Sequence, residues 1–388
     1  MNNAFIKKFI TSIKNQLGEG KHFLHEPMFA GNEIKYLKNT INSTFVSSTG
    51  PYISLFEKKL KDITKSKYVV AVVNGTEALH ISLISLGIKN GDEILVPSLT
   101  FVGTVNAISY CGANPHFIDS EISSLGIDTN KLEKYLENNT KIIGGKCINI
   151  KTKKTIKAII PVHIFGHICK INEVLKIAKK FKLLVIEDAA EALGSYFKKK
   201  HAGTFGNIGC LSFNGNKIIT TGGGGAIITN DKRTAKNIRH LITTAKKKHK
   251  WEYDHDQVGY NLRMPNINAA LGLAQLEKLK LFLNAKKKLL FRYKQSFKKF
   301  PGLKLYENNK GLDSNYWLQT IILDNKNSKY KNKIIQLAHV NQIFVRPAWK
   351  LISNLKPYRK KPRMNLDGAK EIYNRVINLP SSQNLILK

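Results

Sequence analysis

The 388-residue sequence has few cysteines and no long apolar run. Its four cysteines, Cys111, Cys147, Cys169 and Cys210, form no CxxC pair and no regular spacing, so neither a disulfide framework nor a zinc site is expected. Lysine or asparagine interrupts every hydrophobic stretch before the roughly 18 apolar residues that a membrane-spanning helix needs. We therefore expect no transmembrane segment, and free thiols in the reducing cytoplasm.

Acidic residues are also scarce, since 27 Asp and Glu stand against 63 Lys and Arg, for a formal net charge of +36. A field of that sign attracts nucleic acid and other polyanions. The lysines are, however, spread along the whole chain in short runs such as 198–200, 246–248 and 286–288. This spread favours a drift in composition over a nucleic-acid-binding surface. The same field would help to gather a substrate that carries a diphosphate.

The first residues have the spacing of an amphipathic helix. Apolar side chains recur every three or four positions at Phe5, Ile6, Phe9, Ile10, Ile13 and Leu17. The segment lacks the continuous apolar centre and the cleavage site of a secretory signal. We expect an N-terminal arm, residues 1–24, that docks against the rest of the protein and not on a membrane.

From about residue 67, short β-branched runs alternate with longer helical patterns, which is typical of βαβ units around a mainly parallel sheet. Strands are expected at 68–73, 93–97, 116–119, 156–162, 183–187, 210–213 and 226–229, and helices at 76–86, 102–111 and 171–181. The pattern predicts a large α/β domain at 25–265.

The sheet pattern ends near residue 265, and 266–300 reads as one long helix. It would bridge to a smaller α+β domain, so that 266–388 forms a C-terminal unit. The remainder of this unit, including 316–323 and 343–346, is expected to mix strands and helices on a smaller scale. The Lys- and Asn-rich stretches 137–154 and 307–314 are expected to be surface loops or hairpins.

The most informative segment runs from a strand through Lys217 to four glycines at 222–225. Consecutive glycines allow positive φ or the close approach of a ligand. The lysine precedes the glycines, which excludes the GxxxxGK loop of nucleotide triphosphatases. A lysine amine attacks an aldehyde when burial or a nearby cation depresses its pKa, and Lys217 is placed for that role. The alternative is an ordinary surface lysine, against which only the surrounding residues argue.

Two other segments supply what an aldehyde cofactor such as pyridoxal 5′-phosphate (PLP) needs. Asp188 follows the strand 183–187. A buried carboxylate there would keep the cofactor's ring nitrogen protonated, although a metal-binding or capping aspartate is the alternative. Gly75 and Thr76 begin a helix directly after a strand, where free N–H groups and the helix dipole favour a phosphate. Asn-Gly-Thr at a helix start is also ordinary capping chemistry.

An aromatic residue and a group of possible metal ligands were weighed as well. Phe101 follows the strand 93–97 and either stacks on a flat ring or belongs to the core. His163, His167 and Cys169 lie close together, but no further ligand pair follows at zinc-like spacing. No metal is expected.

These segments, in this order, resemble the DegT/DnrJ/EryC1/StrS family of sugar aminotransferases, a branch of the fold type I PLP enzymes that includes perosamine synthases. The resemblance covers nearly the whole chain and rests on His25-Glu-Pro, Asn74-Gly-Thr-Glu-Ala-Leu, Glu187-Asp-Ala-Ala-Glu, Ser212-Phe-Asn-Gly-Asn-Lys and Gly259-Tyr-Asn-Leu-Arg-Met-Pro. It implies an α/β protein of the fold type I PLP-dependent transferase class, with a large domain around a mainly parallel sheet and a smaller C-terminal α+β domain.

The resemblance also implies roles for single residues. Lys217 would bond to PLP, Asp188 would meet the ring nitrogen, and Phe101 would stack on the ring. Glu191 stands where many relatives carry glutamine near the cofactor's 3′-oxygen.

For the phosphate group, the resemblance implies a cup made of Gly75, Thr76 and Ser212. Asn261 would reach into this cup from the partner subunit of a homodimer with shared active sites.

Within the family, the segments 45–51, 213–217 and 346–347 look most like the branch acting on UDP-linked 4-keto-6-deoxy-N-acetylhexosamine, en route to bacillosamine or legionaminic acid. L-glutamate would give its amino group, and the sugar C4 ketone would receive it, for the synthesis of surface-glycan amino sugars. His163, Asn315, Tyr316 and Arg346 are candidate substrate-pocket residues by position, and a structural role is equally compatible with each.

Two rival functions stay open at this point. A related PLP-dependent sugar dehydratase would carry histidine in place of Lys217. A regulatory or nucleic-acid-binding protein on the same fold would account for the charge but would have no use for Lys217 and Asp188 together.

Overall fold

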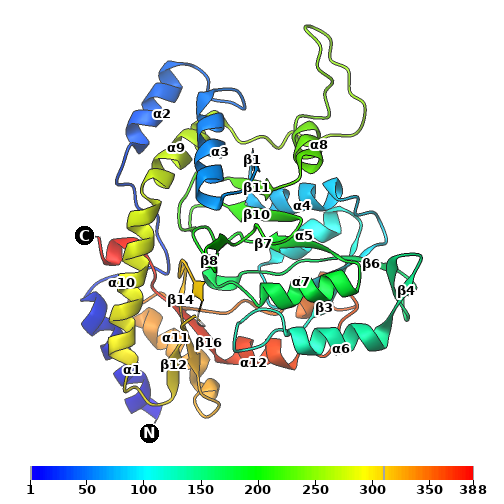
Figure 1. Cartoon of the computed structure of the whole chain (residues 1–388). Helices are drawn as coiled ribbons and strands as arrows, with labels where there is room; N and C mark the ends of the chain where they lie inside the picture. The colour runs from blue at the N-terminus through cyan, green and yellow to red at the C-terminus, as the bar shows by residue number, and fades with distance from the viewer. Residues whose placement is uncertain (1, 309–310, 388) are drawn as a thin grey trace.

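The computed structural model describes residues 2–308 and 311–387, and its centre is a nine-stranded sheet (Figure 1). The main path runs in the order β1-β11-β10-β7-β6-β2-β3, with bounds β1 (Tyr68–Val72), β11 (Gly225–Thr229), β10 (Ile208–Ser212), β7 (Leu184–Asp188), β6 (Thr155–Ile159), β2 (Glu93–Pro97) and β3 (Asn114–Ile118). The last five strands of this path are parallel, whereas β11 is antiparallel to both of its neighbours. The prediction of a mainly parallel sheet is therefore confirmed.

Helices cover both faces of this sheet, as βαβ connections require (Figure 1). One group of helices contains α4 (Gly75–Ser85), α5 (Val102–Tyr110) and α8 (Lys232–Ile242). A second group, apart from the first, contains α6 (Thr129–Asn139) and α7 (Ile171–Lys180). Burial from both faces explains why β2 and β11 are buried along their whole length. The stretch expected as a loop or hairpin at 137–154 contains the hairpin of β4 (Thr140–Ile143) and β5 (Lys146–Asn149), which is paired to β6.

The expected single helix at 266–300 is wrong in one respect, because two helices occupy it. The helix α9 (Asn266–Glu277) ends at Lys278, and α10 (Leu279–Phe297) begins directly after it. The break lets α9 pack on α2 (Glu33–Asn42) and α3 (Pro51–Thr64) while α10 runs on into the C-terminal part. Apolar periodicity continues through the break, so the sequence pattern did not reveal it.

The C-terminal part is built on a second sheet in the order β12-β14-β16-β15. Its strands are β12 (Leu303–Leu305), β14 (Gln319–Leu323), β16 (Val376–Leu379) and β15 (Arg346–Pro347), with α11 (Lys331–Val340) and α12 (Asp367–Arg375). The N-terminal helix α1 (Asn2–Leu17) docks here, as expected: Phe9 and Ile13 are fully buried in a separate hydrophobic core with Tyr293 and Phe297 of α10.

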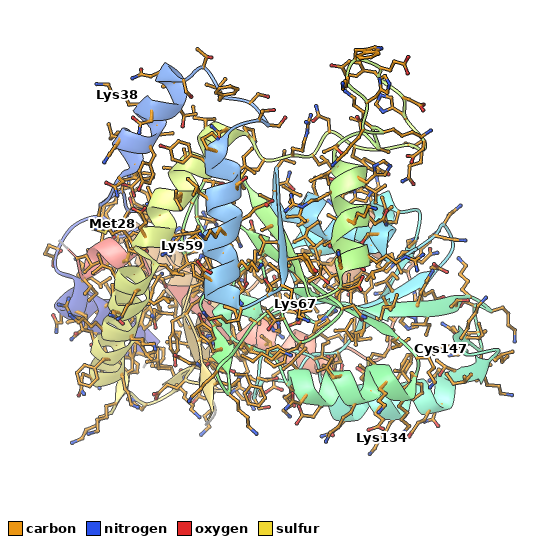
Figure 2. All side chains as sticks on the ribbon, turned by 45° about the horizontal axis from the view of Figure 1, so that its top comes forward. Met28, Lys38, Lys59, Lys67, Lys134 and Cys147 are labelled. Atoms are coloured by element: carbon orange, nitrogen blue, oxygen red, sulfur yellow. The ribbon has the colours of Figure 1, made fainter. Side chains whose placement is uncertain are left out.

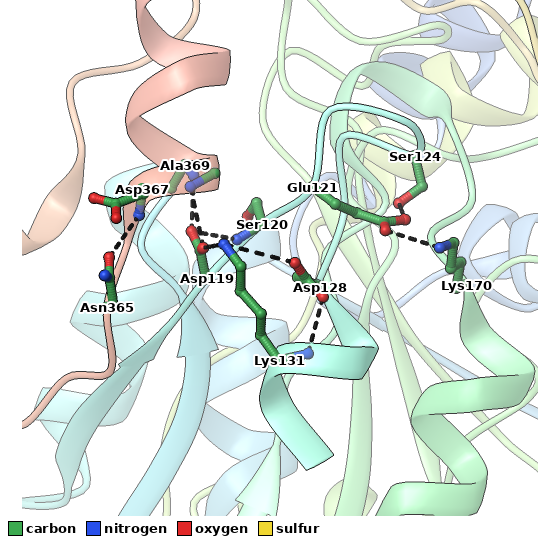
Figure 3. A network of polar contacts seen from close by, with 11 residues as sticks. Asp119, Ser120, Glu121, Ser124, Asp128, Lys131, Lys170, Asn365, Asp367 and Ala369 are labelled. Carbon is green, nitrogen blue, oxygen red and sulfur yellow. Dashed lines mark hydrogen bonds and ion pairs between the residues drawn. The ribbon is translucent and has the colours of Figure 1, made fainter. Parts of the chain in front are cut away.

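A buried carboxylate fastens α12 to the central sheet (Figure 3). Asp119, directly after β3, accepts hydrogen bonds from the backbone N–H groups of Gly368 (3.1 Å) and Ala369 (2.7 Å) in the first turn of α12. It also accepts one from Lys131 of α6 at 2.8 Å. The first N–H groups of a helix have no partner within it, so Asp119 acts as a cap supplied by a distant segment.

Exposed lysines occur on separate parts of the molecule (Figure 2). Figure 2 shows Lys38 on α2, Lys134 on α6 and Lys67 in the connection between α3 and β1, and all three are exposed. This distribution agrees with a compositional origin of the net charge. Among the described residues, no helix is long and apolar enough to cross a membrane.

Candidate active site

A cavity of about 260 Å³ opens at the carboxyl ends of the parallel strands. Asn74, Phe101, Asp188 and Ser212 line it, and they come from the ends of β1, β2, β7 and β10 or from the residues just after them. In open α/β sheets this edge is where ligands bind. Lys217 lines the same cavity, so the segments singled out in the sequence meet in space.

The start of α4 is shaped to hold a small anion. Asn74 caps the helix, because its side chain accepts a hydrogen bond from the N–H of Glu77 at 2.8 Å. A Cβ on Gly75 would lie 2.8 Å from the Cβ of Ser212, so only glycine fits where α4 meets β10. A Cβ on Gly103 would lie 2.7 Å from the hydroxyl of Thr76. These close approaches leave the N–H end of α4 and the Ser212 hydroxyl facing one cavity.

The amine of Lys217 is held between a carboxylate and an indole ring. Its Nζ donates a hydrogen bond to Glu191 at 3.2 Å and lies 4.1 Å from the ring centroid of Trp317. Glu191 also accepts a hydrogen bond from the N–H of Phe165 at 2.8 Å. Burial raises the pKa of Glu191, an effect that Lys217 opposes. The amine is therefore oriented by fixed neighbours inside the cavity.

The second carboxylate of the site, Asp188, lies at the end of β7 and is only 5% exposed. Thr104 donates a hydrogen bond to one of its oxygens at 2.7 Å, and the N–H of Ala190 donates to the other at 3.1 Å. The hydroxyl of Thr100 lies 2.9 Å from that of Thr104. The carboxylate is thus oriented within the cavity and keeps acceptor capacity for a cationic N–H group.

Aromatic side chains form the walls. Phe101 is half exposed. The centroid of its ring lies 6.4 Å from that of Trp349, and the two ring planes make an angle of 61°. Trp317 donates its indole N–H to the carbonyl of Asn216 at 2.7 Å. Neither tryptophan was singled out from the sequence. The available signal was weak: Trp317 directly follows the predicted pair Asn315-Tyr316, and tryptophan is rare, at three residues in the chain.

Two of the candidate substrate-pocket residues take part in buried networks. His163 lies 2.9 Å from the carboxylate of Glu187, which also accepts three backbone N–H groups from the segment 203–206. Asn315 donates to the carbonyls of Glu191 (2.8 Å) and Leu193 (2.9 Å) and accepts the N–H of Trp317 at 2.8 Å. Asn315 therefore holds the two residues that flank Lys217.

None of the four candidates, His163, Asn315, Tyr316 and Arg346, is among the residues that line the cavity. Tyr316 packs its ring against His167, with centroids 5.4 Å apart, and Arg346 is an exposed residue of β15. Asn261 is exposed and accepts a hydrogen bond from Arg263 at 3.3 Å. Among the described residues, no group of three or more histidine, cysteine or acidic side chains is placed to hold a metal ion.

The glycine run at 222–225 packs close to the start of α4. Gly222 has a φ of +78°, and a Cβ on Gly225 would lie 2.5 Å from the backbone of Asn74. Of the two uses of these glycines considered for the sequence, positive φ is observed, at Gly222. The close approach at Gly225 is to the backbone of Asn74, the cap of α4.

The residues present fit PLP on chemical grounds. A phosphate suits the α4 terminus with Ser212, an aldehyde suits the Lys217 amine, a protonated ring nitrogen suits Asp188, and a flat ring suits the aromatic walls. Each of these groups borders the same cavity.

Comparison with known proteins agrees with this chemistry. The model of the DegT/DnrJ/EryC1/StrS aminotransferase family matches residues 27–388. A GDP-perosamine synthase of Escherichia coli O157:H7 is 36% identical over 362 residues, 93% of each chain. A GDP-perosamine synthase of Caulobacter vibrioides is 35% identical over 361 residues, 92% of each chain.

Solved structures agree as well. PseC of Helicobacter pylori, an aminotransferase involved in the biosynthesis of pseudoaminic acid, has a TM-score of 0.85 at 26% identity, over 94% of this chain and 95% of its own. A family member from Brucella abortus has a TM-score of 0.80 at 27% identity, over 91% and 90% of the two chains. Aminotransferases of this family use PLP. Together these findings support a PLP-dependent sugar aminotransferase of fold type I. They do not favour the PLP-dependent sugar dehydratase or the nucleic-acid-binding protein. The chain belongs to the DegT/DnrJ/EryC1/StrS aminotransferase family.

Proposed function

We propose that this chain transfers the amino group of L-glutamate to the C4 ketone of a nucleotide-linked 4-keto-6-deoxy sugar, with Lys217 as the residue that bonds to PLP. The observation that carries the proposal is the convergence of one amine, one buried carboxylate and one helix N-terminus on a single cavity. When bound, PLP supplies an electron sink that lets an amino group leave one carbon and join another.

The residues of the chain then have distinct tasks. Lys217 would hold PLP through a C=N bond to its aldehyde carbon, formed with loss of water, and its amine, when free, would hold and move a proton at Nζ. Asp188 keeps the ring nitrogen protonated, and Glu191 orients the amine of Lys217. Gly75, Thr76 and Ser212 bind the phosphate, whereas Phe101 and the two tryptophans flank the ring and exclude water.

The names of the relatives support a sugar acceptor. Two are GDP-perosamine synthases, and PseC is an aminotransferase involved in the biosynthesis of pseudoaminic acid. For this chain we propose a UDP-linked 4-keto-6-deoxy-N-acetylhexosamine, on the resemblance of the segments 45–51, 213–217 and 346–347. The proposed location is the cytoplasm, which suits four free thiols.

We further propose that the active protein is a homodimer. Among the described residues that line the cavity, Lys217 is the sole lysine or arginine, yet glutamate and a sugar nucleotide are both anionic. Lys246–Lys248 and Lys250 lie on a projecting segment beside Trp251 and Tyr253, which are 72% and 78% exposed (Figure 1). Arg263, which is bridged to Val72 of β1, borders the same hollow as these cations. A second copy would bury these aromatic side chains and bring cations, with Asn261, to the cavity.

We also propose three units along the chain: an arm at 1–24, a PLP-binding domain at 25–265 and a C-terminal unit at 266–388. The hydrophobic cores support this division in part: one core joins the arm to the C-terminal unit, whereas the other contains the PLP-binding domain together with C-terminal residues such as Leu279, Phe282 and Trp317.

The test is an absorbance titration of the purified protein with PLP. A near-ultraviolet to visible band of the lysine-bound cofactor should vanish on addition of L-glutamate and return with the keto sugar nucleotide, in its UDP-linked and not its GDP-linked form. Lys217→Ala should fold and show no turnover. Turnover in Lys217→Ala, or no band in the wild-type protein, would refute the role of Lys217, and a preference for the GDP-linked sugar would refute only the nucleotide. Light scattering that finds a monomer would refute the dimer.

A further inference from the structure

A second lysine, Lys286, contacts Trp317, which lines the cavity. The proposed mechanism does not use Lys286. It is fully buried in the middle of α10, where its Nζ donates hydrogen bonds to the carbonyl oxygens of Trp317, at 2.9 Å, and of Ser381. None of the described carboxylates pairs with it, and burial holds the pKa of Lys286 well below its ordinary value. A buried amine of this kind costs free energy unless its hydrogen bonds are made, so the position of these two carbonyls is tied to Lys286.

Segments that are distant in the sequence meet at this lysine. Ser381 follows β16, and its N–H donates to the carbonyl of Leu24 at 2.7 Å. The hydroxyl of Ser381 accepts the N–H of Gln319 at 2.7 Å, and the side chain of Gln319 donates to the carbonyl of Lys286 at 3.1 Å. The N-terminal arm, α10, the start of β14 and the segment after β16 are therefore joined in one hydrogen-bonded group directly behind Trp317.

The indole of Trp317 is the part of this group that reaches Lys217. Three contacts fix Trp317: its N–H donates to Asn315, its indole N–H donates to Asn216, and its carbonyl accepts from Lys286. Of these contacts, the one from Lys286 ties Trp317 to α10. The ring centroid lies 4.1 Å from the Nζ of Lys217, so a shift of the Trp317 backbone moves a wall that touches the reacting amine.

We propose that Lys286 is a positioning residue that, through the carbonyl of Trp317, holds the indole ring against Lys217. The inference rests on the proposed role of Lys217. Lys286 touches neither substrate nor cofactor, and it acts on the reaction by fixing the geometry in which Lys217 meets the aldehyde.

The test is the rate at which the cofactor-free protein captures PLP, followed by the growth of the absorbance band of the lysine-bound cofactor. Lys286→Met keeps the length of the side chain and removes both hydrogen bonds. Capture should slow by about 10-fold to 100-fold, because a displacement of about 1 Å in a reacting geometry costs up to that much.

The chain contains a matched control. Lys331 of α11 is also buried and also donates to a backbone carbonyl, that of Tyr373, but neither Lys331 nor Tyr373 lines the cavity. Lys331→Met should leave the capture rate within about twofold of the wild-type rate while it changes the melting temperature. A folded Lys286→Met protein that captures PLP at the wild-type rate overturns the proposal.

A second variant covers the case in which Lys286→Met does not fold. Trp317→Leu removes the ring and leaves Lys286 in place, and it should slow capture in the same range; capture at the wild-type rate overturns the proposal. Where both variants fold, the double variant should be no slower than Trp317→Leu, and multiplied losses would contradict action through Trp317. If the wild-type protein gives no band with PLP, the proposed role of Lys217 itself fails, so the two failures are distinguishable.

Discussion

The contact between α4 and β10 predicts how strongly one methyl group at Gly75 disturbs cofactor binding. A Cβ at Gly75 would lie 2.8 Å from the Cβ of Ser212 and 3.1 Å from its hydroxyl oxygen. The backbone of Gly75 is not in the left-handed region, so the effect of Gly75→Ala is steric and not conformational. To make room, either the first turn of α4 or the end of β10 must shift, and both border the proposed phosphate site.

Overpacking of this kind costs about 1–3 kcal/mol. If the strain is relieved by displacing the phosphate-binding N–H groups, the Kd for PLP rises by between about 5-fold and 160-fold. If the strain instead remains in the cofactor-free protein, the free energy of unfolding of that protein falls by the same amount. Measuring both the Kd for PLP and the free energy of unfolding therefore accounts for the whole cost.

The matched control is Gly215→Ala, since a Cβ at Gly215 meets no atom within 4 Å. Titration of PLP followed by absorbance should show weaker binding for Gly75→Ala and wild-type binding for Gly215→Ala. If Gly75→Ala binds PLP as tightly as the wild-type protein and is equally stable, the α4 terminus is not the phosphate site and the close approach has no energetic weight.

Three further predictions concern other parts of the molecule. His201 is buried, and its Nε2 accepts a hydrogen bond from the N–H of Gly194. Burial lowers the pKa of His201 to about 4. Between pH 6.5 and 4, the imidazole of His201 therefore binds a proton only in the unfolded chain. The free energy of unfolding should fall by up to about 3 kcal/mol as the pH drops through that window, and urea unfolding should show a smaller fall in His201→Gln; equal falls would contradict the argument. Asp188→Asn keeps the size of the side chain and removes its charge, so turnover should drop by about 100-fold or more while PLP still binds, and wild-type turnover would exclude the proposed role of Asp188. Phe9→Ala should lower the free energy of unfolding by about 3–5 kcal/mol. Phe29→Ala, at a side chain that is 58% exposed, should lower it by less than about 1 kcal/mol. Similar losses for the two variants would mean that the core that α1 forms with α10 does not stabilise the protein.

Much of the large domain could be predicted from the sequence, because its information is local. The strand at 93–97 was predicted with the bounds that the structure has, and the neighbouring strands differ by one to three residues at their ends. Asp188 ends β7 and Gly75 begins α4, whereas Lys217 lies in the loop that follows β10. Since the carboxyl ends of parallel strands share one edge of the sheet, the residues at or just after those ends could be expected to lie near one another.

What could not be predicted depends on contacts between distant segments. Trp317 and Trp349 reach the cavity from the C-terminal part, and no periodicity around them indicates where that part packs. The break at Lys278 lies inside a continuous apolar pattern and reflects the different surfaces that α9 and α10 contact. His163 was weighed as a metal ligand or a pocket residue, whereas its position beside Glu187 is a property of the assembled sheet.

The capping of α12 by Asp119 has a consequence for how substrates enter. The carboxylate joins the end of β3 to the first turn of α12 through two backbone hydrogen bonds, and Lys131 holds it from α6. Any swing of α12 away from the sheet would break both backbone hydrogen bonds together and leave two N–H groups of α12 without this acceptor, so a wide hinge motion at this point is costly. We expect the two sheets to move as one rigid frame, with entry to the cavity controlled by the short segments at its mouth, those that carry Phe101, Asn214 and Trp349.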